Sequence, residues 1–190
     1  MGIAERKDRQ RTEREHHITQ AARLIAEREG WNAVTIRRLA DEIEYSQPVI
    51  YSHFENRDAI VEAVAVEGFR EFTSEIQEVA RGSADPRKAL ENAATAYLAF
   101  ALGNPALYAA MFTLPTSLRF ADPEKTRPEL RAAFRALAAV VAPFCADAEI
   151  ATETFWASLH GLAELERTGR IRPNVRAERL ALVVHGLLRS

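Results

Sequence analysis

Residues 46–54, SQPVIYSHF, bring together side chains that suit hydrogen bonding to another molecule. The amide of Gln47 both donates and accepts hydrogen bonds, while Tyr51, Ser52 and His53 add two hydroxyl groups and an imidazole. Two apolar residues lie between them. Such a set is suited to recognising a partner rather than to breaking its bonds. The alternative is a buried core segment, because aromatic residues at helical spacing often belong to a core.

Residues that could support catalysis or bind a metal are few. His160 and Glu164 are four positions apart and could share a metal ion, but a stable site requires three or four ligands. The sequence has no Gly-rich phosphate loop, no His-Glu-x-x-His motif and no paired nucleophile and base. The single cysteine, Cys145, lies in an apolar stretch where a small hydrophobic role suits it. We therefore expect no enzyme activity, no metal site and no cofactor.

Composition and charge narrow the class of protein. The chain has 190 residues, 47% hydrophobic and 27% charged, so it can bury a sizeable core. Its net charge of -2 gives no global attraction to nucleic acid, so any such binding depends on local placement. The N-terminal residues are densely charged, and the apolar run at 180–184 is far too short to span a bilayer. These features predict a cytoplasmic protein without membrane contact.

Spacings of three and four between apolar residues recur along the whole chain, which predicts an all-α fold. About nine helices are expected, over residues 11–29, 36–43, 48–54, 57–80, 90–102, 105–112, 130–141 and 147–168, and from 174 to near the C-terminus. The second and third helices are short. The loop at 81–86 is the clearest linker.

The two short helices at 35–54 have the spacing of a helix-turn-helix, with Thr35 and Ser46 as N-caps. Ile50 and Phe54 are four apart and seat the second helix, which leaves its other face outward. In such a unit this helix enters the major groove of DNA, where Gln47 could pair with an adenine edge. Charge does not decide between DNA binding and an ordinary helical corner, because residues 1–57 hold ten basic and ten acidic side chains.

The segments ITQAARLIAEREGW and TIRRLADEIEYSQPVIYSHFENRDAIVEAV closely resemble the N-terminal domain of the tetracycline-repressor (TetR) family of transcriptional regulators. The resemblance covers about residues 13–72. It implies a homodimer that binds a palindromic operator in double-stranded DNA, and a C-terminal helical domain that accepts a small-molecule inducer. The chain then divides into a flexible charged arm at 1–12, a DNA-binding domain at 13–72 with its motif at 35–54, and a ligand-binding and dimerisation domain at 73–190.

The resemblance also implies which side chains meet DNA. Base contacts are expected from Arg37, Gln47, Pro48, Val49 and His53, and phosphate contacts from Thr35, Ser46, Tyr51 and Arg57. One departure is Glu44, which occupies a turn position where the family usually has glycine because the backbone there is left-handed. The charged arm either touches DNA or is solvated, and the sequence leaves both open.

In the C-terminal half, Trp156, His160 and Gly161 resemble a subgroup of the family with a Trp-x-x-x-His-Gly signature, and NPALYAAMF at 104–112 fits the same subgroup. Candidate pocket residues are Tyr97, Tyr108, Met111, Phe112, Phe134, Trp156 and His160, although each also suits a plain core. A dimer interface is expected from Leu159, Gly161, Leu162, Leu180, Val183, Val184, Gly186 and Leu187.

These observations predict a DNA-binding transcriptional regulator of the repressor type that a small-molecule inducer releases from its operator. Two alternatives remain. One is a dimeric DNA-binding regulator without a small-molecule ligand, and the other is a helical metal-binding protein or enzyme.

Overall fold

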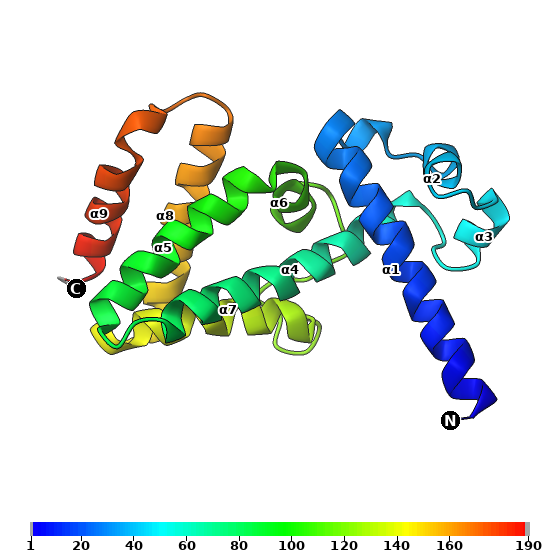
Figure 1. Ribbon diagram of the computed structural model, residues 1–190. Coiled ribbons are helices and arrows are strands. Elements are labelled where there is room, and N and C mark those ends of the chain that lie inside the picture. Colours follow the sequence, from blue (N-terminus) through cyan, green and yellow to red (C-terminus); the bar gives the residue numbers. More distant parts are fainter. Residues whose placement is uncertain (1, 189–190) are drawn as a thin grey trace. The chain divides into compact units, whose positions relative to one another are not determined.

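The computed structural model describes residues 2–188, with only the backbone of residues 3 and 4. Over this range the chain forms nine α-helices and three short 3-10 helices, with no strand (Figure 1). The all-α prediction is confirmed. None of the helices in the described range is long and apolar enough to cross a lipid bilayer. The helices form two compact units, described separately below.

The first unit contains the described residues up to Gly68 together with Ala106–Leu118. It holds α1 (Ile3–Glu29), η1 (Trp31–Ala33), α2 (Ile36–Glu42), α3 (Gln47–Tyr51), the first half of α4 (Arg57–Arg81) and nearly all of α6 (Pro105–Phe112). In Figure 1 the two short helices lie beside the long α1. Its core comes from the apolar positions spaced three and four apart, among them Ile18, Ala22, Ile25, Leu39, Ile50 and Ile60.

Helix α1 begins at Ile3, well before the start expected near residue 11. Residues 3–12, expected to be a flexible arm, therefore form its first turns. No glycine or proline interrupts the segment, and Arg11 bonds Glu15 one turn later, the pairing that stabilises an exposed helix. Charge density had suggested fraying, whereas alternating charges at helical spacing favour a helix.

Helix α6 lies in the first unit although it is distant from α1 in the sequence. Both carboxylate oxygens of Glu27 in α1 accept hydrogen bonds from its first backbone N–H groups, those of Ala106 and Leu107, at 3.0 Å each. The indole of Trp31 donates to the carbonyl of Ala106 at 2.8 Å. At Gly68 of α4 an added Cβ would approach the side chain of Leu107 to 2.8 Å, so the two helices touch closely there.

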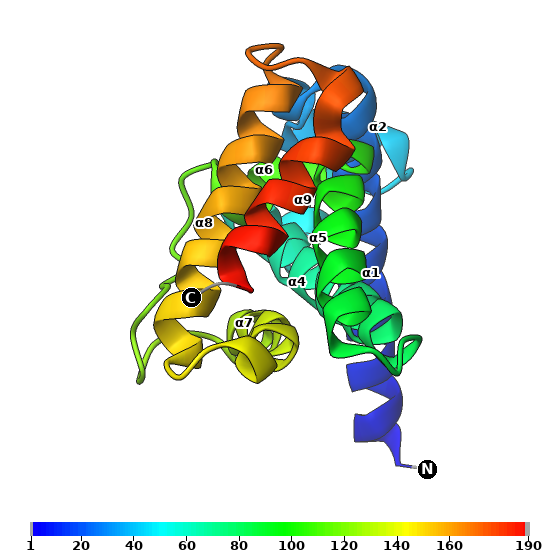
Figure 2. The same ribbon diagram turned by 90° about the vertical axis from the view of Figure 1, so that its left-hand side faces the viewer.

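The second unit comprises Phe69–Pro105 and the described residues from Arg119 on. Here α5 (Pro86–Gly103) packs against α7 (Pro128–Val141), α8 (Ala148–Arg167) and α9 (Arg176–Leu187), and Figure 2 shows α8 and α9 side by side. Two further 3-10 turns, η2 (Ala142–Phe144) and η3 (Pro173–Val175), precede α8 and α9.

An ion-pair cluster joins α8 to α9. The Glu166 carboxylate, 5% exposed, accepts from Arg176 Nε at 2.9 Å and from Arg179 Nη2 at 3.1 Å. The hydrogen bond from Arg176 is the main reason that the pKa of Glu166 is lowered, and Arg179 adds to the effect. This cluster fixes the connection between the last two helices.

Candidate nucleic-acid interface

Helix α3 presents the face that the sequence predicted. Ile50 and Phe54 are buried and seat the helix, whereas Gln47 and Pro48 are exposed at its N-terminal end and Tyr51 is 53% exposed. Proline in the first turn removes no helical hydrogen bond. Ser46 occupies the N-cap position, but its side chain makes no capping bond in the structure. The result is a short helix with free polar groups on its outer side.

Helix α2 begins at a capped and exposed end. The hydroxyl of Thr35 accepts the backbone N–H of Arg38 at 3.1 Å, as the N-cap prediction required. Arg37 is exposed, whereas the guanidinium of Arg38 already bonds Glu42 and Glu29. Arg37 is therefore the arginine of this pair whose side chain is directed to solvent.

Between the two helices the backbone of Glu44 is left-handed, with φ of 56°. This is the conformation that the expected glycine would adopt without steric cost, and a residue with a Cβ pays about 1–2 kcal/mol there. The turn thus keeps the geometry typical of a helix-turn-helix, at the expense of some stability.

His53 follows α3 and is mostly covered. Its side chain is 7% exposed, and Nδ1 lies 3.3 Å from Oε1 of Glu15 in α1. Burial alone would raise the pKa of Glu15, but hydrogen bonds with Arg11 and His53 outweigh it and lower the pKa. The imidazole links α1 to the end of α3, which leaves little of it for the base contact that was expected.

Arg57, expected at a phosphate, makes two hydrogen bonds inside its own unit. Its Nε donates to the carbonyl of Val34 at 2.9 Å, and its Nη2 donates to the carbonyl of Trp31 at 2.7 Å. These carbonyls belong to the turn that leads into Thr35. The side chain therefore fixes the N-terminal end of α2, a role that the sequence did not reveal, and its phosphate contact stays a prediction.

The candidate pocket residues fall into both units. In the first unit Tyr108 and Met111 are buried, and Phe112 contacts Tyr108 with ring centroids 4.9 Å apart. Here Tyr108 and Met111 serve as core, and Phe112 is half-buried. Whether they also line a ligand site stays a prediction.

In the second unit Tyr97 is buried, and its hydroxyl accepts the indole N–H of Trp156 at 3.0 Å. Phe120, 41% exposed, stacks on Trp156, while Phe134 and His160 are half-buried. Burial lowers the pKa of His160, which favours its neutral form near pH 7. Phe120 was missed because it lies in the irregular segment between α6 and α7, where no periodicity marks it.

The residues expected at a dimer interface differ in how far the structure exposes them. Leu159, Leu180, Val184 and Leu187 are buried within the second unit, where they serve as core, and their part in a dimer interface stays a prediction. The apolar repeat that suggested them marks the inward side of α8 and α9, toward α5. Gly161, Leu162 and Val183 are half-buried and Gly186 is exposed. An added Cβ at either glycine would meet nothing within 4 Å.

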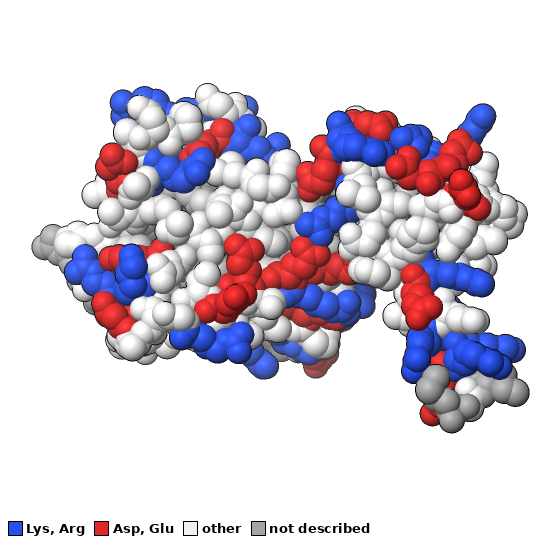
Figure 3. Space-filling view, in the orientation of Figure 1, with Lys and Arg blue, Asp and Glu red and all other residues white. Residues whose placement is uncertain are grey.

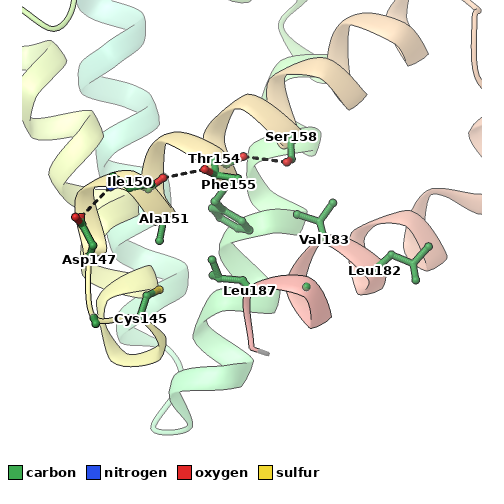
Figure 4. Close-up of a pocket in the computed structure, with 12 residues that line it drawn as sticks. Cys145, Asp147, Ile150, Ala151, Thr154, Phe155, Ser158, Leu182, Val183 and Leu187 are labelled. Carbon is green, nitrogen blue, oxygen red and sulfur yellow. Dashed lines mark hydrogen bonds between the residues drawn. The ribbon is translucent and has the colours of Figure 1, made fainter. Parts of the chain in front are cut away.

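Other large apolar side chains on α8 and α9 are exposed to solvent. Leu182 is 71% exposed, Ile150 is 62% exposed and Leu165 is 40% exposed. Ile150 and Leu182 also line an open cleft of about 570 Å³ between the two helices, whose floor includes Phe155 and Leu187 (Figure 4). These residues lie outside the main apolar repeat, so the sequence pattern did not single them out.

The capped α2, the left-handed turn and the outward α3 define a helix-turn-helix, the element by which many proteins bind the major groove. Residues 18–64 match the family model described as bacterial regulatory proteins, tetR family. Residues 90–187 match the model described as tetracyclin repressor-like, C-terminal domain. The chain belongs to the TetR family of transcriptional regulators, and it is a DNA-binding regulator.

Individual relatives agree with this assignment. The chain is 31% identical over 155 residues to an uncharacterised HTH-type transcriptional regulator of Mycobacterium tuberculosis, Rv0681, covering 80% of this chain and 69% of that protein. A protein of unknown function from Rhodococcus sp. RHA1 has the same fold, with a TM-score of 0.76, 22% identity and coverage of 92% and 93%. FadR from Bacillus subtilis, solved in complex with stearoyl-CoA, has a TM-score of 0.68, 16% identity and coverage of 90% and 98%.

Proposed function

We propose that this regulator is a repressor whose homodimer binds a palindromic operator through α3 and leaves it when a small molecule binds the C-terminal half. The observation that carries the DNA-binding part is the outward α3, with exposed Gln47 and Pro48 held by buried Ile50 and Phe54. In a dimer the two copies of α3 would read successive major grooves about 34–36 Å apart. Arg37 and Val49 would add base contacts.

Phosphate contacts in this proposal come from groups at the rim of α3. Tyr51 is exposed and offers a hydroxyl, while Ser46 and Thr35 are exposed at the starts of α3 and α2. The free backbone N–H groups of the first turn of α2 add to the attraction for an anion. Arg57 would contribute mainly by holding that turn in place.

The proposed effector is a small molecule with apolar surface that binds the aromatic group formed by Tyr97, Trp156 and Phe120, beside His160. Support comes from the partly exposed rings of Phe120 and Trp156 and from the neutral imidazole favoured by burial. A protein of the same fold binds stearoyl-CoA, so acyl compounds are reasonable first probes. Trp156, His160 and Gly161 also support placing the chain in the Trp-x-x-x-His-Gly subgroup.

The decisive experiment is to select genomic DNA fragments with the purified protein and to sequence them. The wild-type protein should enrich one palindromic motif. Gln47→Ala should relax selection at one position of each half-site, at a cost of about 1–3 kcal/mol there, because the amide is the longest polar group at the start of α3. If the variant selects the same motif as the wild type, α3 does not read bases through Gln47.

A further inference from the structure

The early start of α1 adds a row of basic side chains to its N-terminal half, ahead of the turn that contacts the segments before and after α3. Lys7, Arg11 and Arg14 are separated by four and three positions, and Ile18 follows Arg14 after four more. Residues at such spacing share one side of a helix. Ile18, Ala22 and Ile25 continue the same row and are all buried in the first unit. The three basic residues thus lie on the same side of α1 as the residues that pack against the domain core.

Two contacts join the segments just before and just after α3 to α1. His17 is 3.4 Å from the hydroxyl of Tyr45, just before α3, and their rings meet edge to face. Glu15 is 3.3 Å from His53, just after α3. These two contacts lie on either side of the row that Lys7, Arg11 and Arg14 occupy.

The three cations differ in how they are held. Arg11 bonds Glu15 at 2.8 Å and is tied through it to His53. Lys7 and Arg14 are exposed and make no ion pair within residues 2–188. Figure 3 shows Lys and Arg side chains gathered over this end of α1. Two exposed cations on the helix that contacts both segments flanking α3 are well placed to meet an anionic partner that α3 approaches.

We infer that the N-terminal half of α1 forms a second DNA contact, in which Lys7 and Arg14 bind backbone phosphates next to the groove that α3 enters. The inference rests on the proposed use of α3 at the operator. It adds affinity without sequence preference, because phosphates carry no base information. Arg11 is paired with Glu15, which partly neutralises its charge.

The test compares two double variants that remove the same charge from different sides of one helix. K7Q/R14Q alters the row beside α3, and R6Q/R9Q, the matched control, alters positions outside it. Operator affinity is measured by fluorescence anisotropy over a range of salt concentrations. The slope of log affinity against log salt should become shallower by about 1.8 per bound protomer for K7Q/R14Q, because each lost phosphate contact removes about 0.9. The R6Q/R9Q slope should equal that of the wild type.

Hydroxyl-radical footprints provide a second readout, in which K7Q/R14Q should lose protection at backbone positions that R6Q/R9Q still protects. Equal slopes for both variants and the wild type, or equal losses in both variants, would overturn the inference. Far-UV circular dichroism verifies that the helix is retained. If the wild-type protein selects no DNA, the proposed function is contradicted as well. If the wild type binds DNA but all slopes are equal, only this inference is contradicted.

Discussion

Arg57 holds the turn that leads into α2, whether or not it also reaches a phosphate. Its two hydrogen bonds to the carbonyls of Trp31 and Val34 hold the turn before Thr35. We expect Arg57→Ala to lower the free energy of unfolding by about 1.5–3 kcal/mol, since bonds from a charged donor are lost. Arg57→Lys keeps the charge but not the planar fork, so it should be nearly as destabilised.

Denaturant unfolding measures the stability of both Arg57 variants. Operator binding distinguishes a charge contact with DNA from positioning of the turn before Thr35. If Arg57→Lys binds the operator as tightly as the wild type, the charge matters and the carbonyl bonds do not. If Arg57→Lys weakens operator binding without changing its salt dependence, Arg57 acts by positioning the turn before Thr35.

Glu44 gives a second prediction at this scale. Its left-handed φ of 56° is unfavourable for a residue with a Cβ. Glu44→Gly should therefore raise the free energy of unfolding, by roughly 0.5–1 kcal/mol after the greater entropy of glycine in the unfolded chain is subtracted. Glu44→Ala is the control, because it removes the charge but keeps the Cβ. A stability gain of equal size in the alanine variant would trace the effect to the carboxylate instead.

Some residue roles could be predicted from sequence and others could not. The burial of Ile50 and Phe54 and the exposure of Gln47 follow from helical spacing, which is local. The bonds of Arg57 and the contact of His53 with Glu15 join segments more than twenty positions apart. They depend on how three helices pack, and no local pattern encodes them.

At the scale of elements, the ion-pair cluster between α8 and α9 should stabilise the fold less at low pH. Because the folded-state pKa of Glu166 is lowered, its contribution to stability is fully present above the unfolded pKa of about 4.5 and is lost as pH falls through the folded value. Glu166→Gln should cost about 1–3 kcal/mol at pH 7 and progressively less below pH 4.5.

Urea unfolding from pH 7 to pH 3 measures the effect of Glu166→Gln. Glu153→Gln, an exposed position on the same helix, is the control and should follow the wild type throughout. A Glu166→Gln cost that stays constant down to pH 3 would contradict the assignment.

The order and approximate bounds of the helices were predictable because each has its own apolar repeat and its own caps or breakers. The start of α1 was not predictable, because its first turns carry no apolar repeat. Opposite charges at helical spacing stabilise these turns, and no glycine or proline interrupts them. The side chains on the outer surface of α8 and α9 were also missed. There the inward repeat is the stronger signal, and isolated residues such as Leu182 do not form a pattern.

For the whole molecule, we propose that a second copy packs on the outer sides of α8 and α9, where Ile150 and Leu182 are exposed beside the cleft. Leu182→Glu should convert a dimer into monomers, because it puts a charge where a 71% exposed leucine would be buried on pairing. Operator affinity should then fall by about 10²–10⁴-fold, since the two half-sites are no longer linked. Sedimentation velocity measures the assembly state. Leu24→Glu changes a 57% exposed leucine in the first unit and should leave that state unaltered.

The attachment of α6 to α1 affects how the protein can be divided. A fragment ending after α4 would keep all the residues that sequence comparison assigns to DNA binding. It would nevertheless leave Glu27 without the N–H groups of Ala106 and Leu107, strip the indole of Trp31 of its acceptor and expose the surface at Gly68. Engineered sensors that borrow only the amino-terminal segment would therefore inherit an incomplete core, and a usable module must carry residues 106–118 with it.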